Sequence, residues 1–145
     1  MDDYQVVKVT NIEGEFEGLN EDVLFKMSDG TAWLQDEYRY WYHYAYSPKV
    51  VILKNRETYF AKIDGISQVV AVREIFDFIE SQINGEFQGW DGESRYELLN
   101  GQVWEQSEYK YEYKYAYMPR VCIFQGLSGI VMQVHGTHAK VRRVR

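Results

Sequence analysis

The chain has 145 residues, of which 46% are hydrophobic and 17% aromatic, and its net charge is −6. No apolar run reaches the roughly 20 residues that a membrane-spanning helix requires, so we expect no membrane association. The acidic balance makes nucleic acid an unfavourable partner, because phosphate neutralisation needs a surplus of Lys and Arg. The opening MDDYQVVKV lacks a basic start and an apolar stretch, and the single Cys122 cannot form an internal disulfide, so we expect a cytoplasmic protein.

The apolar residues alternate with a period of two along most of the chain, which predicts strands rather than helices. Asp29-Gly30 and Asn100-Gly101 lie between apolar runs and predict hairpins with type I′ turns, in which both central residues need positive φ. The stretch REIFDFIESQI at 73–83 is ambiguous. We predict that it is mainly strand, with a linker helix as the alternative.

The second half of the chain repeats the first at an offset of 71 residues. EYRYWYHYAYSPKVVI at 37–52 aligns with EYKYEYKYAYMPRVCI at 108–123, and Trp33 aligns with Trp104. Without a gap, 12–52 and 83–123 share 18 identities in 41 positions. This similarity predicts a tandem duplication, with repeats at 1–74 and 75–145 that superpose as the same unit.

Each repeat is too small to hide its sheet edges except by curling into a barrel. We therefore predict an all-β fold of two tandem copies of a small SH3-like (Src-homology-3-like) β-barrel. An oligonucleotide-binding-type barrel is the alternative.

Four segments of the second repeat form a pattern that can be compared with known domains. They are GEFQGW at 85–90, NGQVWEQ at 100–106, PRVCI at 119–123 and KVRRVR at 140–145. This pattern resembles an uncharacterised bacterial small β-barrel domain, and the resemblance covers nearly the whole chain. The first repeat departs from it at Leu19, which aligns with Trp90. The resemblance implies the barrel fold and no particular activity.

Ten tyrosines alternate in two runs, at 38–46 and 109–117. Strand geometry places the five rings of each run on one face, and the opposite face of the second run is charged and predicted to be solvated. We favour packing of the rings inside or between the barrels. The alternatives are an exposed ledge that stacks a peptide, sugar or base, and an edge that drives oligomer formation. Because a small barrel cannot hold five tyrosines, the central members should divide between core and outer contacts: Tyr40, Tyr42, Tyr44, Tyr111, Tyr113 and Tyr115.

The remaining candidates are weighed by whether both repeats contain them. Trp33 and Trp104 recur directly after the hairpin turns and are predicted to be core anchors. Trp41 and Trp90 have no counterpart in the other repeat, so they are candidates for a specific ligand contact. His135 and His138 lack a third ligand at zinc spacing, so we predict no metal site.

No catalytic set recurs in both repeats, and we predict no enzyme activity and no cofactor. The expected function is a non-enzymatic binding module that contacts a protein or peptide partner. The alternatives are a structural, homo-oligomer-forming protein and a weak nucleic-acid-binding module. The candidate ligand-binding residues are Tyr40, Trp41, Tyr42, Tyr44, Trp90, Tyr111, Tyr113 and Tyr115.

Overall fold

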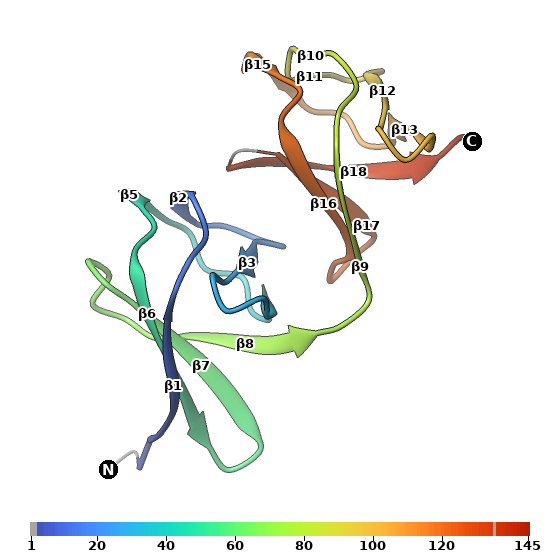
Figure 1. Ribbon diagram of the computed structural model, residues 1–145. Coiled ribbons are helices and arrows are strands. Elements are labelled where there is room, and N and C mark those ends of the chain that lie inside the picture. The colour runs from blue at the N-terminus through green and yellow to red at the C-terminus, as the bar shows by residue number, and fades with distance from the viewer. Residues whose placement is uncertain (1–2, 135) are drawn as a thin grey trace. The chain divides into compact units, whose positions relative to one another are not determined.

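The computed structural model describes residues 3–134 and 136–145, and this part of the chain contains strands, turns and loops but no helix. The prediction of an all-β fold is therefore confirmed. The chain divides into two compact units, residues 1–76 and 77–145 (Figure 1).

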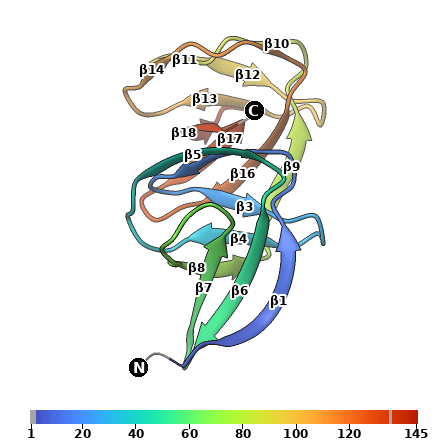
Figure 2. The same ribbon diagram turned by 90° about the vertical axis from the view of Figure 1, so that its left-hand side faces the viewer.

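The described residues of the first unit form eight strands. These are β1 (Gln5–Asn11), β2 (Glu15–Leu19), β3 (Leu24–Lys26), β4 (Ala32–Gln35), β5 (Trp41–Tyr46), β6 (Lys49–Asn55), β7 (Thr58–Ile63) and β8 (Val70–Ile75). Six of them form an antiparallel sheet in the order β1-β6-β7-β8-β4-β3, while β2 and β5 pair as a separate ribbon. Figure 2 shows the long strands β1, β6 and β7 side by side. The sheet curls until its two edge strands, β1 and β3, meet. An antiparallel bridge joins Ile12, which follows β1, to Met27, which follows β3.

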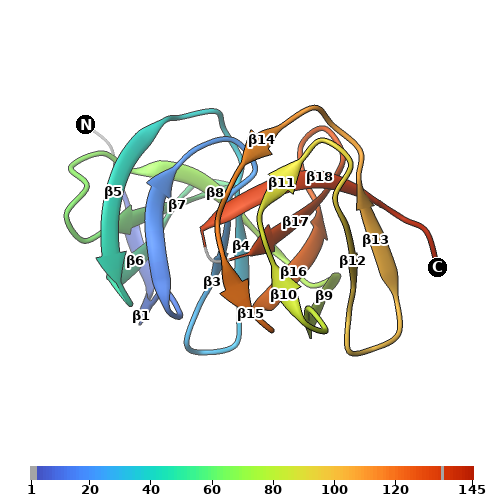
Figure 3. The same cartoon turned by 90° about the horizontal axis from the view of Figure 1, so that it is seen from above.

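The described residues of the second unit form ten strands. These are β9 (Phe78–Gln82), β10 (Glu86–Phe87), β11 (Trp90–Asp91), β12 (Arg95–Glu97), β13 (Val103–Gln106), β14 (Tyr111–Glu112), β15 (Ala116–Tyr117), β16 (Arg120–Gln125), β17 (Ile130–Val134) and β18 (Thr137–Arg143). The six-stranded sheet has the order β9-β16-β17-β18-β13-β12, which matches the first unit strand for strand. Its edges also meet, through a bridge between Ile83 and Leu98. The ribbon is split into two short pairs, and Figure 3 shows β14 and β15 beside β11 and β10.

The alternating apolar side chains of each sheet fill a separate core. Val50, Ile52 and Ile63 are buried in the core of the first unit. Val121 and Ile123 are likewise buried in the core of the second unit. Trp33 and Trp104 are 2% and 5% exposed, so the prediction that they are core anchors is confirmed. Each indole N–H is bonded locally, to Thr31 Oγ1 (3.1 Å) and to Gln102 Oε1 (3.0 Å) respectively.

The two predicted hairpin turns occur at the expected positions but are not type I′. Gly30 and Gly101 have φ of 92° and 89°, whereas neither Asp29 nor Asn100 has positive φ. Gly30 N–H donates to the Met27 carbonyl (3.0 Å), and Met27 N–H donates to the Thr31 carbonyl (2.9 Å). This arrangement is a three-residue loop with glycine in the left-handed position.

Residues 73–83 form strands on both sides of a short break, as predicted. β8 ends at Ile75 and β9 begins at Phe78, and the intervening Phe76 is exposed.

The chain bends at one equivalent point in each unit, where the sheet passes into the ribbon. Ser47 and Met118, each directly before a proline, both have φ of 47°, a left-handed conformation that side chains other than glycine rarely adopt. Their N–H groups donate to the carbonyls of Gly14 and Gly85, each over 2.7 Å. The bend positions the tyrosine-bearing strand.

Candidate functional site

The two runs of tyrosines lie on the outer surface of the ribbon in each unit. We call Tyr38, Tyr40, Tyr42, Tyr44 and Tyr46 the first tyrosine face, and Tyr109, Tyr111, Tyr113, Tyr115 and Tyr117 the second tyrosine face. All ten side chains are exposed, from 52% for Tyr44 and Tyr115 to 94% for Tyr109. The prediction that the central members divide between core and outer contacts is therefore wrong. The physical reason is that Phe16 and Phe87, from the partner strands of the ribbons, already fill the space beneath.

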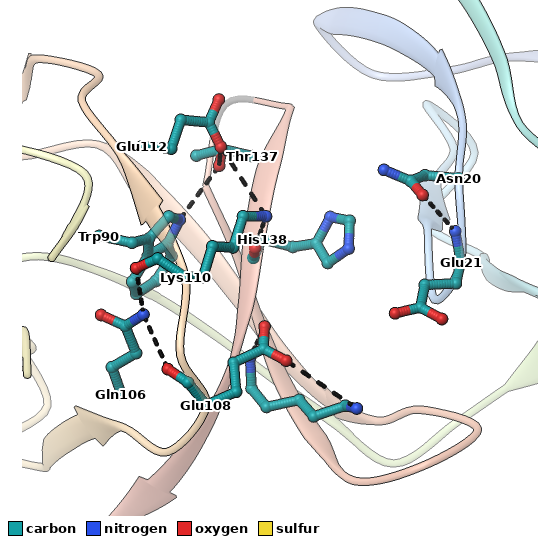
Figure 4. Close-up of polar contacts among 10 residues, drawn as sticks. Asn20, Glu21, Trp90, Gln106, Glu108, Lys110, Glu112, Thr137 and His138 are labelled. Carbon is teal, nitrogen blue, oxygen red and sulfur yellow. Dashed lines mark hydrogen bonds and ion pairs between the residues drawn. The ribbon is translucent and has the colours of Figure 1, made fainter. Parts of the chain in front are cut away.

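The expectation that the charged side of the second run is solvated holds for Glu112, which is exposed, whereas the other three charged side chains are half-buried. Lys110 and Lys114 are half-buried, and Lys110 Nζ donates to the carbonyl oxygen of His138 (Figure 4). Glu108 accepts a hydrogen bond from Lys140 N–H (3.1 Å). Long lysine side chains can pack along apolar surface while their charged ends reach polar partners. These contacts hold the strand with its tyrosines outward.

A buried glutamine fixes the start of each tyrosine run. Gln106 Nε2 donates to the carbonyl oxygens of Glu108 (3.1 Å) and Lys110 (2.8 Å), as Figure 4 shows. Its Oε1 accepts from Gly92 N–H (2.8 Å). The side chain therefore joins the beginning of the run to the loop after β11.

Gln35 makes the equivalent contacts in the first unit. Its Nε2 donates to the carbonyls of Glu37 (2.9 Å) and Arg39 (3.1 Å), and its Oε1 accepts from Asn20 N–H (3.2 Å). These positioning residues were absent from the sequence-based candidates. The signal that could have found them is the glutamine two residues after the tryptophan in both units.

The ribbon depends on a glycine in each unit. Gly18 has φ of 108° and Gly89 φ of 90°. A Cβ at these positions would collide with the carbonyl oxygens of Trp41 and Glu112 respectively. Only glycine therefore permits this close approach of the two ribbon strands.

The two unmatched tryptophans differ in exposure. Trp41 is 36% exposed, at the start of β5, where it pairs with the buried Leu19 on the side of the strand opposite to the tyrosines. Trp90 is buried, and its Nε1 donates to Thr137 Oγ1 (3.0 Å), which donates to Glu112 Oε1 (2.6 Å) (Figure 4). The Trp90 ring thus packs in the core and holds β18 against the ribbon.

The carboxylate of Glu86 lies next to Tyr115 of the second tyrosine face. Tyr115 Oη donates to Glu86 Oε1 (3.3 Å). The pKa of the Tyr115 phenol is raised above its ordinary value. The larger cause is partial desolvation, and the next is the negative charge of Glu86. The phenol is therefore a neutral hydrogen-bond donor at physiological pH.

A pocket of about 340 Å³ opens beside the second tyrosine face. Its lining includes Gln88, Trp90, Asp91, Arg95, Tyr111 and Tyr113. Of the predicted site residues, the structure thus brings Trp90, Tyr111 and Tyr113 together at one pocket, whereas Tyr40, Trp41, Tyr42 and Tyr44 belong to the other unit. Asp91 and Arg95 were missed by sequence reasoning, because their role depends on the loop between β11 and β12.

The loop beside the pocket is tightly hydrogen-bonded. Asp91 Oδ1 accepts from Glu93 N–H (2.8 Å) and from Ser94 Oγ (2.9 Å), and these bonds lower the pKa of the Asp91 carboxyl. Tyr96 Oη donates to the Gly89 carbonyl (2.5 Å), and burial raises the pKa of this phenol. Asp91 is therefore ionised at neutral pH, and Tyr96 is protonated.

Arg95, another residue of the pocket lining, is held by an ion pair. Its Nη2 donates to Glu105 Oε2 (2.7 Å), and Glu105 also binds Arg142. Hydrogen bonds from the two arginines lower the pKa of Glu105 below its ordinary value, and the bond from Arg95 has the larger effect.

Within the described residues, no group of three or more His, Cys, Asp or Glu side chains is arranged to hold a metal ion. His135, one of the two histidines considered from the sequence, lies outside the described residues. The described part of the chain also contains no helix long and apolar enough to cross a membrane. No family model, curated protein or solved structure matches this chain.

Proposed function

We propose that the chain is a non-enzymatic binding module that contacts a protein or peptide partner through its two tyrosine faces. The observation that carries the proposal is the exposure of all ten tyrosines. Large apolar rings gathered on a protein surface are typical of interaction sites. Tyrosine suits such sites because it offers a rigid apolar ring and a polar hydroxyl with little conformational entropy to lose.

The anchoring of the strands beneath the tyrosines supports binding over accidental exposure. Gln35 and Gln106 hold the backbone at the start of each tyrosine run. Lys110 holds the second run to its own unit through the His138 carbonyl. A surface held in one conformation before binding loses less entropy when a partner attaches.

The repeated architecture is the second element of the proposal. We infer two tandem SH3-like barrels that arose by duplication, supported by the offset of 71 residues in the sequence and by the matching strand order of the sheets. Two similar faces on one chain increase the avidity for a partner that engages both.

Self-association is the alternative function that the same observation favours, because exposed tyrosines could also join copies of this chain. Sedimentation velocity across a concentration series separates the two functions. A chain that stays monomeric at micromolar concentration agrees with a binding module. A concentration-dependent dimer that is lost in Tyr→Ser variants supports self-association instead.

The proposal is tested by panning a library of random peptides displayed on phage against the full chain. The comparison variant carries Tyr→Ser at 40, 42, 44, 111, 113 and 115, so that neither tyrosine face remains. Enriched peptides should bind this variant at least about tenfold more weakly, a difference of about 1.4 kcal/mol. Peptides that bind wild type and the variant equally would show that the tyrosine faces are not the binding sites.

A further inference from the structure

We propose that the pocket beside the second tyrosine face binds a neutral polyhydroxylated ring, such as a single sugar residue. The site shares Tyr111 and Tyr113 with the second tyrosine face and adds polar residues that the face lacks, and it is confined to the second unit. Its volume of about 340 Å³ lies at the lower end of the range for small-molecule sites.

The pocket combines fixed hydrogen-bond acceptors and donors. The bonds that hold Asp91 use Oδ1, and the bond that holds Arg95 uses Nη2. Within the described part of the chain, this leaves Asp91 Oδ2 to accept from a ligand and Arg95 Nη1 to donate. Sugar hydroxyls both donate and accept, so a sugar ring can supply a partner for the acceptor and a partner for the donor.

The aromatic side chains of the pocket complete the match to a sugar. Tyr111 and Tyr113 present exposed rings at the lining, and a flat apolar ring surface suits the C–H face of a pyranose. Tyr96 is half-buried, and its hydroxyl is already bonded to Gly89. In this proposal, the rings of Tyr111 and Tyr113 provide the apolar surface of the pocket, while Asp91 and Arg95 provide the hydrogen bonds.

The charge around the pocket disfavours a phosphorylated ligand or a nucleotide. Asp91 is ionised, Glu93 lies in the adjoining loop, and the guanidinium of Arg95 is already paired with Glu105. A phosphate would meet this negative charge at short range. A neutral ring avoids this repulsion.

The fold does not require polar side chains at positions 94 and 95. At the offset of 71, Ser94 and Arg95 align with Val23 and Leu24 of the first unit, and Leu24 is buried there. The first unit therefore forms the same sheet with apolar side chains at these positions. Arg95 is therefore a polar residue specific to the second unit, whereas Asp91 aligns with the polar Asn20.

The test uses the full chain and saturation-transfer difference NMR with methyl glycosides of glucose, galactose, mannose and N-acetylglucosamine at millimolar concentration. We expect saturation transfer to the ring protons of at least one glycoside. Asp91→Asn keeps an oxygen for the loop bonds but loses the charge, and Arg95→Leu inserts the residue found in the first unit. Each should weaken binding at least about tenfold, or about 1.4 kcal/mol, while Glu93→Gln, a neighbour outside the lining, should not.

Absence of transfer from all four glycosides would overturn the proposal, as would equal transfer with wild type, Asp91→Asn and Arg95→Leu. Thermal denaturation of each variant checks that it is folded. Peptides selected on the tyrosine faces should still bind Arg95→Leu, so failure of the sugar site and failure of the proposed peptide function give different results.

Discussion

The side-chain amide of Gln106 donates a hydrogen bond of 2.8 Å to the carbonyl oxygen of Lys110, and Gln35 makes the same bond to Arg39 over 3.1 Å. In both units, a fully buried polar side chain thus determines where the tyrosine run begins. The core clusters do not include residues of this segment, so polar contacts such as those of the glutamine hold its conformation.

Replacement of Gln106 by alanine should lower the free energy of unfolding by about 1–3 kcal/mol, because two carbonyls and one N–H lose their buried partner. Gln106→Glu should be no better, since a carboxylate cannot donate to the two carbonyls. Urea denaturation measures the effect, with the exposed Gln125→Ala as the matched control. Equal stability of Gln106→Ala and Gln125→Ala would contradict this role.

Truncation of an exposed tyrosine should leave stability nearly unchanged. We expect Tyr42→Ala and Tyr113→Ala to change the free energy of unfolding by at most about 0.5 kcal/mol. The buried Phe16→Ala and Phe87→Ala are the controls and should each lose about 3–5 kcal/mol. A large drop in the melting temperature of both tyrosine variants would mean that the tyrosine faces are structural.

Asp29 should make stability depend on pH in the acid range. The pKa of Asp29 is lowered to about 2, chiefly by the hydrogen bond from the Thr31 hydroxyl and further by the Thr31 N–H and Lys8. Partial desolvation acts in the opposite direction but is outweighed. A carboxyl whose pKa is lower in the folded state stabilises the fold above its ordinary pKa near 3.8. That contribution is lost as the pH falls towards about 2.

The comparison variant for this prediction is Asp29→Asn, because asparagine occupies the equivalent position 100 and accepts from Gln102 N–H (2.9 Å). The stability advantage of wild type over Asp29→Asn, measured by urea denaturation, should be constant near neutral pH and vanish near pH 2. An advantage that grows on acidification would have the wrong sign.

Nucleic-acid binding should be weak and salt-sensitive despite the basic carboxy-terminal segment. Lys140, Arg142 and Arg145 lie in ion pairs with Glu108, Glu105 and Glu97. Fluorescence polarisation with a single-stranded DNA oligonucleotide measures the affinity. The double variant Glu97→Gln/Glu105→Gln should bind more tightly than wild type. Submicromolar binding by wild type that persists near 0.2 M salt would refute this prediction, because phosphate contacts weaken steeply at about that concentration.

The strands were predictable because their alternation and turn residues are local signals. The hairpins at Asp29-Gly30 and Asn100-Gly101 occur where the sequence places them, although only the glycines adopt positive φ. The turn type was not predictable, because it depends on how Met27 and Thr31 pair across the loop.

The orientation of the tyrosine runs was not predictable from alternation. Alternation separates two faces of a strand but does not show which face is buried when one is aromatic and the other charged. Hydrophobicity favoured burial of the rings, whereas the inner side holds Ala45 with the half-buried Arg39 and His43. In the second run it holds Ala116 with the half-buried Lys110 and Lys114. The pocket at Asp91 and Arg95 depends on loop geometry, and its signal in the sequence is the replacement of Val23 and Leu24 by Ser94 and Arg95.

The separation of the aromatic residues gives the molecule two independent optical reporters. Trp33, Trp90 and Trp104 are buried with their indole N–H groups bonded, whereas the ten tyrosines of the two faces are exposed. In a Trp41→Phe variant, which lacks the one exposed tryptophan of the described residues, indole emission should therefore follow the interiors of the units during unfolding. Nitration of accessible phenols should instead follow the outer surface and should be slowed wherever a bound partner covers a tyrosine face.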